Sequence, residues 1–314
     1  MGGHERARST PVFLGLAIGF VSAALTLAPW LATGATLPLQ NLWQSNVLPE
    51  DMPFSLLPVN QYYAVRVAVI LIVGGVIAGL TLRFVRRAAR VPSWSASVGL
   101  LLAHGIAIVQ SFVVVADGLG LAPTRSDPRP LLYFGGMLGG TIVAALLAQG
   151  VFWLASRRAV VPVTLGLTLS AVPFAAWIVD AVTTLSPPTG PAPEILLISR
   201  WLPPIIVGVA LGWCGVRPPR RLGIWVISLA ALWITPALFT SLWNALGMRV
   251  LDGDLQAMRE VATQIFPLAL SIGALPVLLA LVLGGIITGA HMTIRRRRKL
   301  ASGPTDRYTE HLVD

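Results

Sequence analysis

Charged residues are scarce in this chain, and that scarcity excludes an ordinary soluble protein. Only 11% of its 314 residues are charged, against roughly 25% in a typical soluble domain. Lys299 is the only lysine, so nearly all of the positive charge is arginine, a bias typical of bacteria. Hydrophobic residues make up 55% of the chain, and its mean hydropathy is +0.76. This composition predicts a protein that crosses a membrane several times.

Residues that commonly carry chemistry are also few. Cys214 is the only cysteine, so the chain can form no internal disulfide and no multi-cysteine metal site. The four histidines are far apart and form no pair at the helical spacing of metal ligands. Nucleophile-elbow, HExxH, dinucleotide-binding and P-loop patterns are missing. We therefore expect no metal and no cofactor, and the sequence favours a protein that is not an enzyme.

Eight long apolar segments predict an all-α bundle of eight membrane spans, arranged as four hairpins. Each segment can cross a ~30 Å hydrocarbon core as a helix, tilted where it is longer than needed. The segments cover residues 11–33, 62–82, 94–116, 131–155, 160–180, 195–216, 222–243 and 267–290. We expect residues 1–290 to form one transmembrane domain and residues 291–314 to form a basic cytoplasmic tail.

Arginines follow every even-numbered span. Four basic residues follow the second span, two the fourth and three the sixth, and a run from Arg295 to Lys299 follows the last. Because basic connections remain on the cytoplasmic side, both termini are predicted to lie inside, in a bacterial cytoplasmic membrane. The net charge of +10 then reflects topology, and no nucleic-acid surface is expected. The run from Arg295 to Lys299 could also hold anionic lipid.

Residues 34–61, between the first two spans, combine four prolines with many apolar side chains. The prolines exclude a continuous helix. The apolar content predicts that this segment lies on the outer interface or folds back against the bundle.

Residues 244–264, between the last two spans, have a different pattern. Leu255, Met258 and Ala262 recur at helical spacing. Asp252 or Asp254 could cap the start of such a helix. The pattern predicts a short outer helix that lies on the bilayer surface.

Glycines four residues apart occur in every even-numbered span. Such pairs let helix backbones approach closely, which stabilises helix contacts in lipid. The even-numbered spans are therefore predicted to form an inner set. One glycine of each should pack closely against another helix: Gly79, Gly139, Gly212 and Gly289.

Polar residues end the third, fifth and seventh spans at regular intervals. Asp117, Asp180 and Asn244 are 63 and 64 residues apart. An internal duplication would produce this spacing, as in many transporters. Hairpins of equal size would produce it as well.

Five polar residues near the outer ends of the predicted spans form the candidate ligand site. They are Asp117, Asp180, Asn244, Arg66 and Arg200. Together they could bind a polar substrate or a lipid headgroup. The alternative is a set of ion pairs at the rim, each worth ~0–1 kcal/mol when exposed.

Three further polar residues lie within the predicted spans: His104, Gln110 and Gln149. An ionisable residue at membrane depth suggests a functional role, so His104 could relay protons. The alternative is a neutral histidine that is hydrogen-bonded to a backbone carbonyl or to Gln149.

These features predict a non-enzymatic, permease-like membrane protein that moves or holds a small polar or lipidic ligand. A first alternative is a structural or assembly subunit of a larger membrane complex, with residues 34–61 as a docking surface. A second alternative is a membrane enzyme that acts on lipid-linked substrates at the outer face. A membrane protein partner or a homo-oligomer is compatible with each.

Overall fold

The computed structural model describes residues 3–40, 42–121, 127–186, 193–247 and 254–301. Over these residues the chain is helical, without strands. Nine α-helices follow one another: α1 (Gly3–Ala32), α2 (Ala64–Val85), α3 (Ser93–Gly118), α4 (Arg129–Ala155), α5 (Val160–Leu185), α6 (Pro193–Cys214), α7 (Arg221–Gly247), α8 (Leu255–Ile272) and α9 (Ala274–Ala301). Two short 3₁₀ helices, Pro49–Asp51 and Gln61–Tyr63, lie between α1 and α2.

Eight of the described helices, α1 to α7 and α9, are long and apolar enough to cross a membrane. The prediction of an all-α protein with eight such segments is therefore confirmed. The chain has the helices of a multi-pass membrane protein. Large apolar side chains cover the outside of the bundle, as lipid-facing surfaces require.

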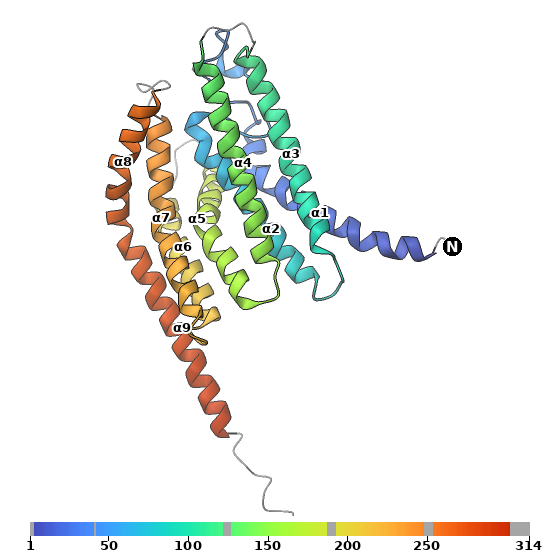
Figure 1. The fold of residues 1–314 in the computed structure, drawn as a ribbon, viewed down its shortest axis with the longest axis vertical. Helices are drawn as coiled ribbons and strands as arrows, with labels where there is room; N and C mark the ends of the chain where they lie inside the picture. Colours follow the sequence, from blue (N-terminus) through green and yellow to red (C-terminus); the bar gives the residue numbers. More distant parts are fainter. Residues whose placement is uncertain (1–2, 41, 122–126, 187–192, 248–253, 302–314) are drawn as a thin grey trace, which may run out of the picture.

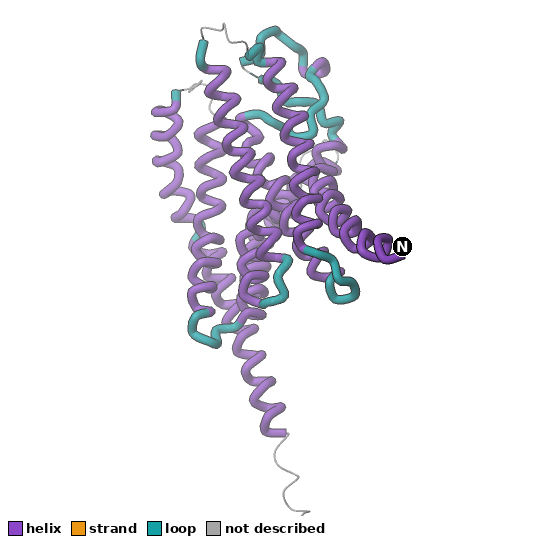
Figure 2. The backbone as a smooth tube through the Cα atoms, turned by 45° about the vertical axis from the view of Figure 1, so that its right-hand side comes forward, coloured by secondary structure: helices purple, strands orange, loops and turns teal. Residues whose placement is uncertain are grey.

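The connections between helices gather at two ends of the bundle (Figures 1 and 2). We call the end that carries residues 33–63 the loop end; these residues form the long teal segment at the top of Figure 2. The opposite end carries the connections 86–92, 156–159 and 215–220, and we call it the arginine end. Helix α9 extends beyond the other helices at the arginine end (Figure 1).

The helices pack as two halves, α1–α4 and α5–α9. The most extensive contacts pair α1 with α3, α2 with α4, and α6 with α9. Helix α5 joins the halves, because it packs against α2 and α4 as well as against α6. Consecutive helices such as α3 and α4 contact each other less than α1 and α3 do, so consecutive hairpins are not the main packing unit.

Close glycine contacts fix the packing of α2 against α4. A Cβ atom added to Gly75 would overlap the carbonyl oxygen of Ala148. One added to Gly79 would lie 2.8 Å from the carbonyl oxygen of Phe152 and 2.7 Å from Cβ of Ala155. Only glycine permits so close an approach of the two backbones.

The same contacts recur between α6 and α9. A Cβ atom added to Gly208 would lie 3.0 Å from the carbonyl oxygen of Ala280. One added to Gly212 would lie 3.3 Å from the carbonyl oxygen of Gly284 and 2.5 Å from Cβ of Ile287. These glycines lie 133 residues after those of α2, and their partners lie 132 residues after those of α4. The packing therefore repeats over four spans, about twice the interval between the polar helix ends.

The predicted inner set of even-numbered spans needs correction. Gly79 and Gly212 contact another helix, but no atom lies within 4 Å of a Cβ atom added to Gly139 or Gly289. The reason is helical geometry. Gly139 precedes Ala148 by nine residues and Gly289 follows Ala280 by nine, and at 3.6 residues per turn this puts each on the opposite side of its helix from the contact.

The last predicted span is divided between two helices. Pro276 lacks an N–H group, and its ring would clash with the carbonyl group of Ile272 in a continuous helix. Helix α8 therefore ends at Ile272, and α9 begins after Gly273. The span expected to begin at Pro267 begins at Ala274 instead, while Pro267 lies inside α8.

Helix α8 does not lie across the bundle as a surface helix would. Asp254 caps its start by accepting hydrogen bonds from the backbone of Gln256 and Ala257, which confirms the predicted helix and cap. However, α8 runs antiparallel beside α7 (Figure 1), where the Ser241 hydroxyl donates to the carbonyl of Ala262 over 2.7 Å. The surface orientation was therefore wrong, because the apolar stripe of α8 packs on a helix as well as it could on lipid.

Candidate functional site

The segment 34–61 folds back into the loop end of the first half, one of the two predicted outcomes. Ser55, Leu57 and Val59 are each 0% exposed. Thr36 and Phe54 form an isolated antiparallel bridge, which draws the two arms of the segment together. Since its prolines prevent helix formation, the buried backbone groups of this segment need partners from side chains.

Helix α3 supplies two of those partners. The Gln110 side-chain oxygen accepts a hydrogen bond from the backbone N–H of Leu56, and the Ser111 hydroxyl accepts one from Leu57, both over 2.8 Å. The Gln110 amide also donates to the carbonyl of Phe54 over 3.0 Å. Gln110, a candidate from the sequence, therefore holds the loop in place.

Helix α4 supplies a third partner. The Tyr133 hydroxyl donates to the side-chain oxygen of Gln40 over 2.6 Å and accepts from the backbone N–H of Gln61 over 3.2 Å. The Gln40 amide in turn donates to the carbonyl of Val59 over 2.8 Å. These bonds fix the end of the loop directly before α2 begins.

The loop also fixes Trp30, near the end of α1. The indole N–H of Trp30 donates to the carbonyl of Ser55 over 2.8 Å, and the side chain is buried. Its ring lies against the guanidinium of Arg66, with 5.2 Å between the ring centroid and Cζ. The Tyr63 ring lies 5.7 Å from the same Cζ. Both are cation–π distances, so two aromatic rings position Arg66.

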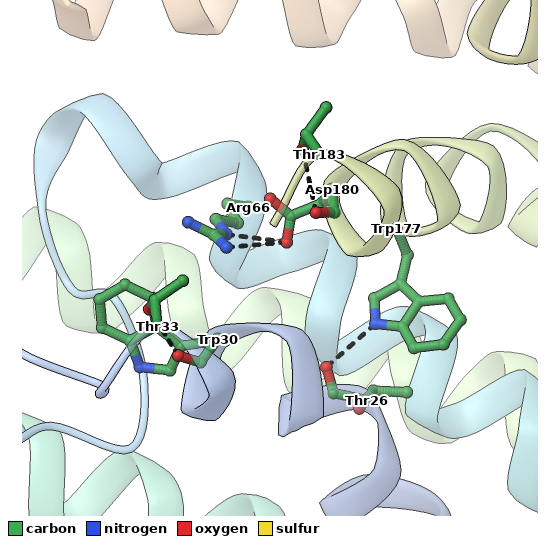
Figure 3. A network of polar contacts seen from close by, with 7 residues as sticks. All are labelled: Thr26, Trp30, Thr33, Arg66, Trp177, Asp180 and Thr183. Atoms are coloured by element: carbon green, nitrogen blue, oxygen red, sulfur yellow. Dashed lines mark hydrogen bonds and ion pairs between the residues drawn. The ribbon is translucent and has the colours of Figure 1, made fainter. Parts of the chain in front are cut away.

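Arg66 forms an ion pair with Asp180 across the two halves (Figure 3). Nη2 of Arg66, on α2, lies 2.9 Å from Oδ2 of Asp180, on α5, and Nε donates to the same oxygen over 3.0 Å. The two side chains are 18% and 24% exposed, so solvent reaches the pair only partly. Among the residues the structure describes, it is the one ion pair that joins the halves.

A second polar contact joins the halves beside this pair. The indole N–H of Trp177, on α5, donates to the carbonyl of Thr26, on α1, over 3.0 Å (Figure 3). One turn from Trp177, the Thr183 hydroxyl donates to the carbonyl of Asp180 over 3.0 Å, which steadies the end of α5. We call Thr26, Trp30, Arg66, Trp177 and Asp180 the inter-half bridge.

The structure brings together two of the five ligand-site candidates. Asp117 is exposed at the end of α3, and Arg200 is exposed on α6 with its guanidinium 5.0 Å from the ring centroid of Trp201. The Asn244 amide donates within its own helix, to the carbonyl of Thr240 over 2.8 Å. None of the three bonds to Arg66 or Asp180 in the described part of the chain. The site is thus smaller than predicted, and it is built from α1, α2 and α5.

The intramembrane candidates are also separated. His104 is 4% exposed, and neither of its ring nitrogens has a hydrogen-bond partner among the described residues. It lies beside α2, where a Cβ atom added to Gly74 would be 3.1 Å from Nε2. Gln149 instead accepts a hydrogen bond from the Ser97 hydroxyl over 2.8 Å. The bond expected between His104 and Gln149 is therefore absent, because Ser97 already occupies the Gln149 oxygen.

Sequence reasoning missed the aromatic members of the bridge. Trp30 and Trp177 were treated as apolar helix residues, although each indole N–H needs a partner when it is buried. Tryptophan near the end of an apolar span was the available signal. Among the described residues, no group of three or more His, Cys, Asp or Glu side chains converges as metal ligands would.

Compared with known protein families, with curated proteins and with solved structures, this chain shows no match. A function must therefore be inferred from the inter-half bridge and from the packing of the two halves.

Proposed function

We propose that this protein is a permease-like carrier of a small polar solute that bears charge, and that the inter-half bridge closes its path at the loop end. The observation that carries this proposal is the Arg66–Asp180 pair. It is partly buried and joins two halves whose internal packing is repeated. An ion pair within one half would connect no moving parts.

The chemistry of the pair suggests what could open it. Removing one partner of a fully buried ion pair costs about 3–5 kcal/mol, because the other charge is left uncompensated. Partial exposure reduces that cost here. A solute with its own carboxylate or ammonium group could replace one partner, so that the halves separate without leaving a bare charge. The rings of Trp30 and Tyr63 would keep the Arg66 guanidinium in place during the exchange.

The repeated packing supports movement of the halves as units. Close glycine contacts make α2 with α4, and α6 with α9, firm pairs. Many transporters consist of two repeats, with the substrate held where the repeats meet. Alternating access then requires rocking of one half against the other while the glycine contacts stay intact.

Orientation in the membrane is part of the proposal. The arginine end is placed in the cytoplasm and the loop end outside, following the positive-inside rule. Reporter fusions after Thr189 and after Ser302, which both lie outside the described residues, should therefore report opposite sides. The same side for both would contradict the eight-span topology.

Uptake into proteoliposomes tests the carrier. The probes are amino acids, dipeptides and small amines, presented as a labelled panel to the wild-type protein. A solute taken up by the wild type should be lost in Asp180→Asn and in Arg66→Gln. Asp127→Asn is the matched control, because Asp127 pairs with Arg129 only two residues away in its own half. Equal uptake, growth and stability in all variants would leave only a structural rim pair.

One observation favours the alternative of an assembly subunit. Gly135, Gly136, Gly139 and Gly140 lie on α4 with no atom within 4 Å of an added Cβ. Exposed glycines on a membrane helix are the usual contact surface for another helix. A membrane protein that co-purifies in stoichiometric amount with the wild type, and is lost in Gly136→Leu, would establish that function.

A further inference from the structure

The arginine end contains a hollow that neither the inter-half bridge nor the carrier proposal uses. Its volume is about 360 Å³, and four arginines line it: Arg83, Arg86, Arg87 and Arg158. Three come from the end of α2 and the residues after it, and Arg158 comes from the connection between α4 and α5. Two separate connections therefore direct positive charge into one space.

Hydrogen bonds hold the two connections in this arrangement. The Arg83 guanidinium donates to the backbone carbonyl of Arg157, which ties the end of α2 to the connection after α4. Nη1 of Arg86 donates to the Ser93 hydroxyl over 3.0 Å, which fixes the turn between α2 and α3. Both arginines are half-buried. Each guanidinium has five N–H donors, so most of their donors remain for a ligand.

No carboxylate balances this charge in the part of the chain that the structure describes. The two ion pairs there, Arg66 with Asp180 and Arg129 with Asp127, involve none of the four arginines. Like charges held close together repel, and an anion between them relieves the repulsion. The hollow thus has the charge and the donors of an anion site.

We propose that this hollow binds a phosphate group, through bidentate hydrogen bonds from its arginines. Guanidinium groups match the geometry of phosphate oxygens, and such charge-assisted bonds are among the strongest in proteins. The phosphate can come from the headgroup of an anionic phospholipid or from a soluble phosphate compound. The inference does not depend on the carrier function, since no residue of the inter-half bridge takes part.

The surroundings of the hollow favour the lipid source. Phe84 is 63% exposed, and its ring centroid lies 4.6 Å from Cζ of Arg87. Trp213 is 41% exposed, and its ring centroid lies 5.6 Å from Cζ of Arg83. Exposed aromatic rings beside arginines are typical of the boundary between headgroups and acyl chains. A headgroup in the hollow would place its acyl chains next to these rings.

Lipid binding to two double variants of the full chain tests the proposal. Arg87→Gln with Arg158→Gln removes two charges that line the hollow. Arg90→Gln with Arg157→Gln removes one charge from each of the same connections, but neither residue lines the hollow. Binding of phosphatidylglycerol and of phosphatidylcholine to the protein in mild detergent is measured by native mass spectrometry, with thermal unfolding as the check of folding.

We expect phosphatidylglycerol to bind the wild type and the control variant, and to bind the hollow variant at least about tenfold more weakly than the control, because charge-assisted bonds are lost. Equal loss in both double variants would overturn the proposal, since it would show attraction by net charge alone. If the hollow variant fails to fold, Arg87→Gln is compared with Arg90→Gln by the same criterion.

Soluble probes identify the source of the phosphate. Inorganic phosphate and glycerol 3-phosphate are added at millimolar concentration to the protein with bound phosphatidylglycerol. No displacement, together with the tenfold difference, establishes a lipid site. Displacement from the wild type but not from the hollow variant establishes a phosphate site open to soluble ligands. Equal retention of phosphatidylcholine and phosphatidylglycerol by the wild type would contradict both.

Discussion

The two halves of the bundle share one packing scheme but differ in how they are closed at the loop end. The first half is sealed by residues 34–61, whose side chains form the largest buried apolar cluster together with α1–α4. The cluster of the second half contains only six buried residues. Helices α2 and α3 have no interior proline, whereas each of α5 to α8 has at least one.

This difference indicates a division of work between the halves. Helices without interior prolines and with a hydrogen-bonded cap make a firm half, because few backbone groups are left without partners. Helices with prolines have freed carbonyl groups and bend at defined points. We infer that the first half is the scaffold and that the second half moves. Each prediction below tests that contrast.

The largest effect is expected at Gly75. Its replacement by leucine would drive a side chain into the backbone of Ala148 and should lower the free energy of unfolding by about 1–3 kcal/mol or more. Gly208→Leu, the equivalent change in the second half, should cost less, because its contact with Ala280 is looser. Thermal unfolding in detergent measures both.

Gly139→Leu is the control for these changes. No neighbour lies within 4 Å of its added Cβ, so the effect should be within about 0.5 kcal/mol. An effect of Gly139→Leu as large as that of Gly75→Leu would mean that α4 is packed differently.

The next effect concerns the cap of the first half. Ser111→Ala would leave the buried N–H of Leu57 without its partner and should cost about 1–3 kcal/mol. Proteolysis within residues 34–61 should accelerate accordingly. Thr240→Ala, which removes only a bond within α7, is the matched change in the second half and should have little effect on either measurement.

The pair between the halves should have a smaller effect on stability than the cap. Asp180→Asn leaves the Arg66 charge without its carboxylate, and because water reaches the pair we expect a cost of about 1–2 kcal/mol, between the values for exposed and buried pairs. A cysteine at Thr183, in a Cys214→Ser background, should react faster with a membrane-impermeant maleimide in this variant.

Charge reversal tests whether that faster reaction reports opening. Combining Arg66→Asp with Asp180→Arg should restore the slow reaction, because the ion pair is rebuilt in the opposite sense. A double variant that stays as reactive as Asp180→Asn would show that Asp180 acts on α5 alone.

The smallest effect is expected at the break between α8 and α9. The indole N–H of Trp233 donates to the carbonyl of Leu270 over 2.8 Å, so Trp233→Phe should cost about 0.5–1.5 kcal/mol. Hydrogen exchange should increase around Gly273 and stay unchanged in α2. Unchanged exchange around Gly273 would show that water replaces the lost donor.

The sequence contains enough information to locate the helices, because the signal is local. Apolar length predicted eight spans, proline density predicted that residues 34–61 would not form one helix, and Asp254 was a recognisable cap. Each of these features depends on residues within one segment and on the backbone alone.

Contacts between helices were much less predictable. Gly79 and Gly139 occur in the same four-residue spacing, yet one packs against a helix and the other does not. Arg66 lies 114 residues before Asp180, and nothing near either residue identifies the partner. The break at Gly273 was misplaced because Pro267 and Pro276 carry the same local signal, and only Pro276 coincides with the bend. Such outcomes depend on how whole helices are arranged.

The cap of the first half imposes an order on synthesis. Tyr133, which holds Gln61, is translated 72 residues later, so at 5–20 residues per second the segment waits about 4–14 s for it. During that interval Ser111 becomes available before Tyr133, and the segment can attach to α3 first. A nascent chain halted before α4 should therefore expose residues 34–61 only in part, and release of the full first half should complete their protection.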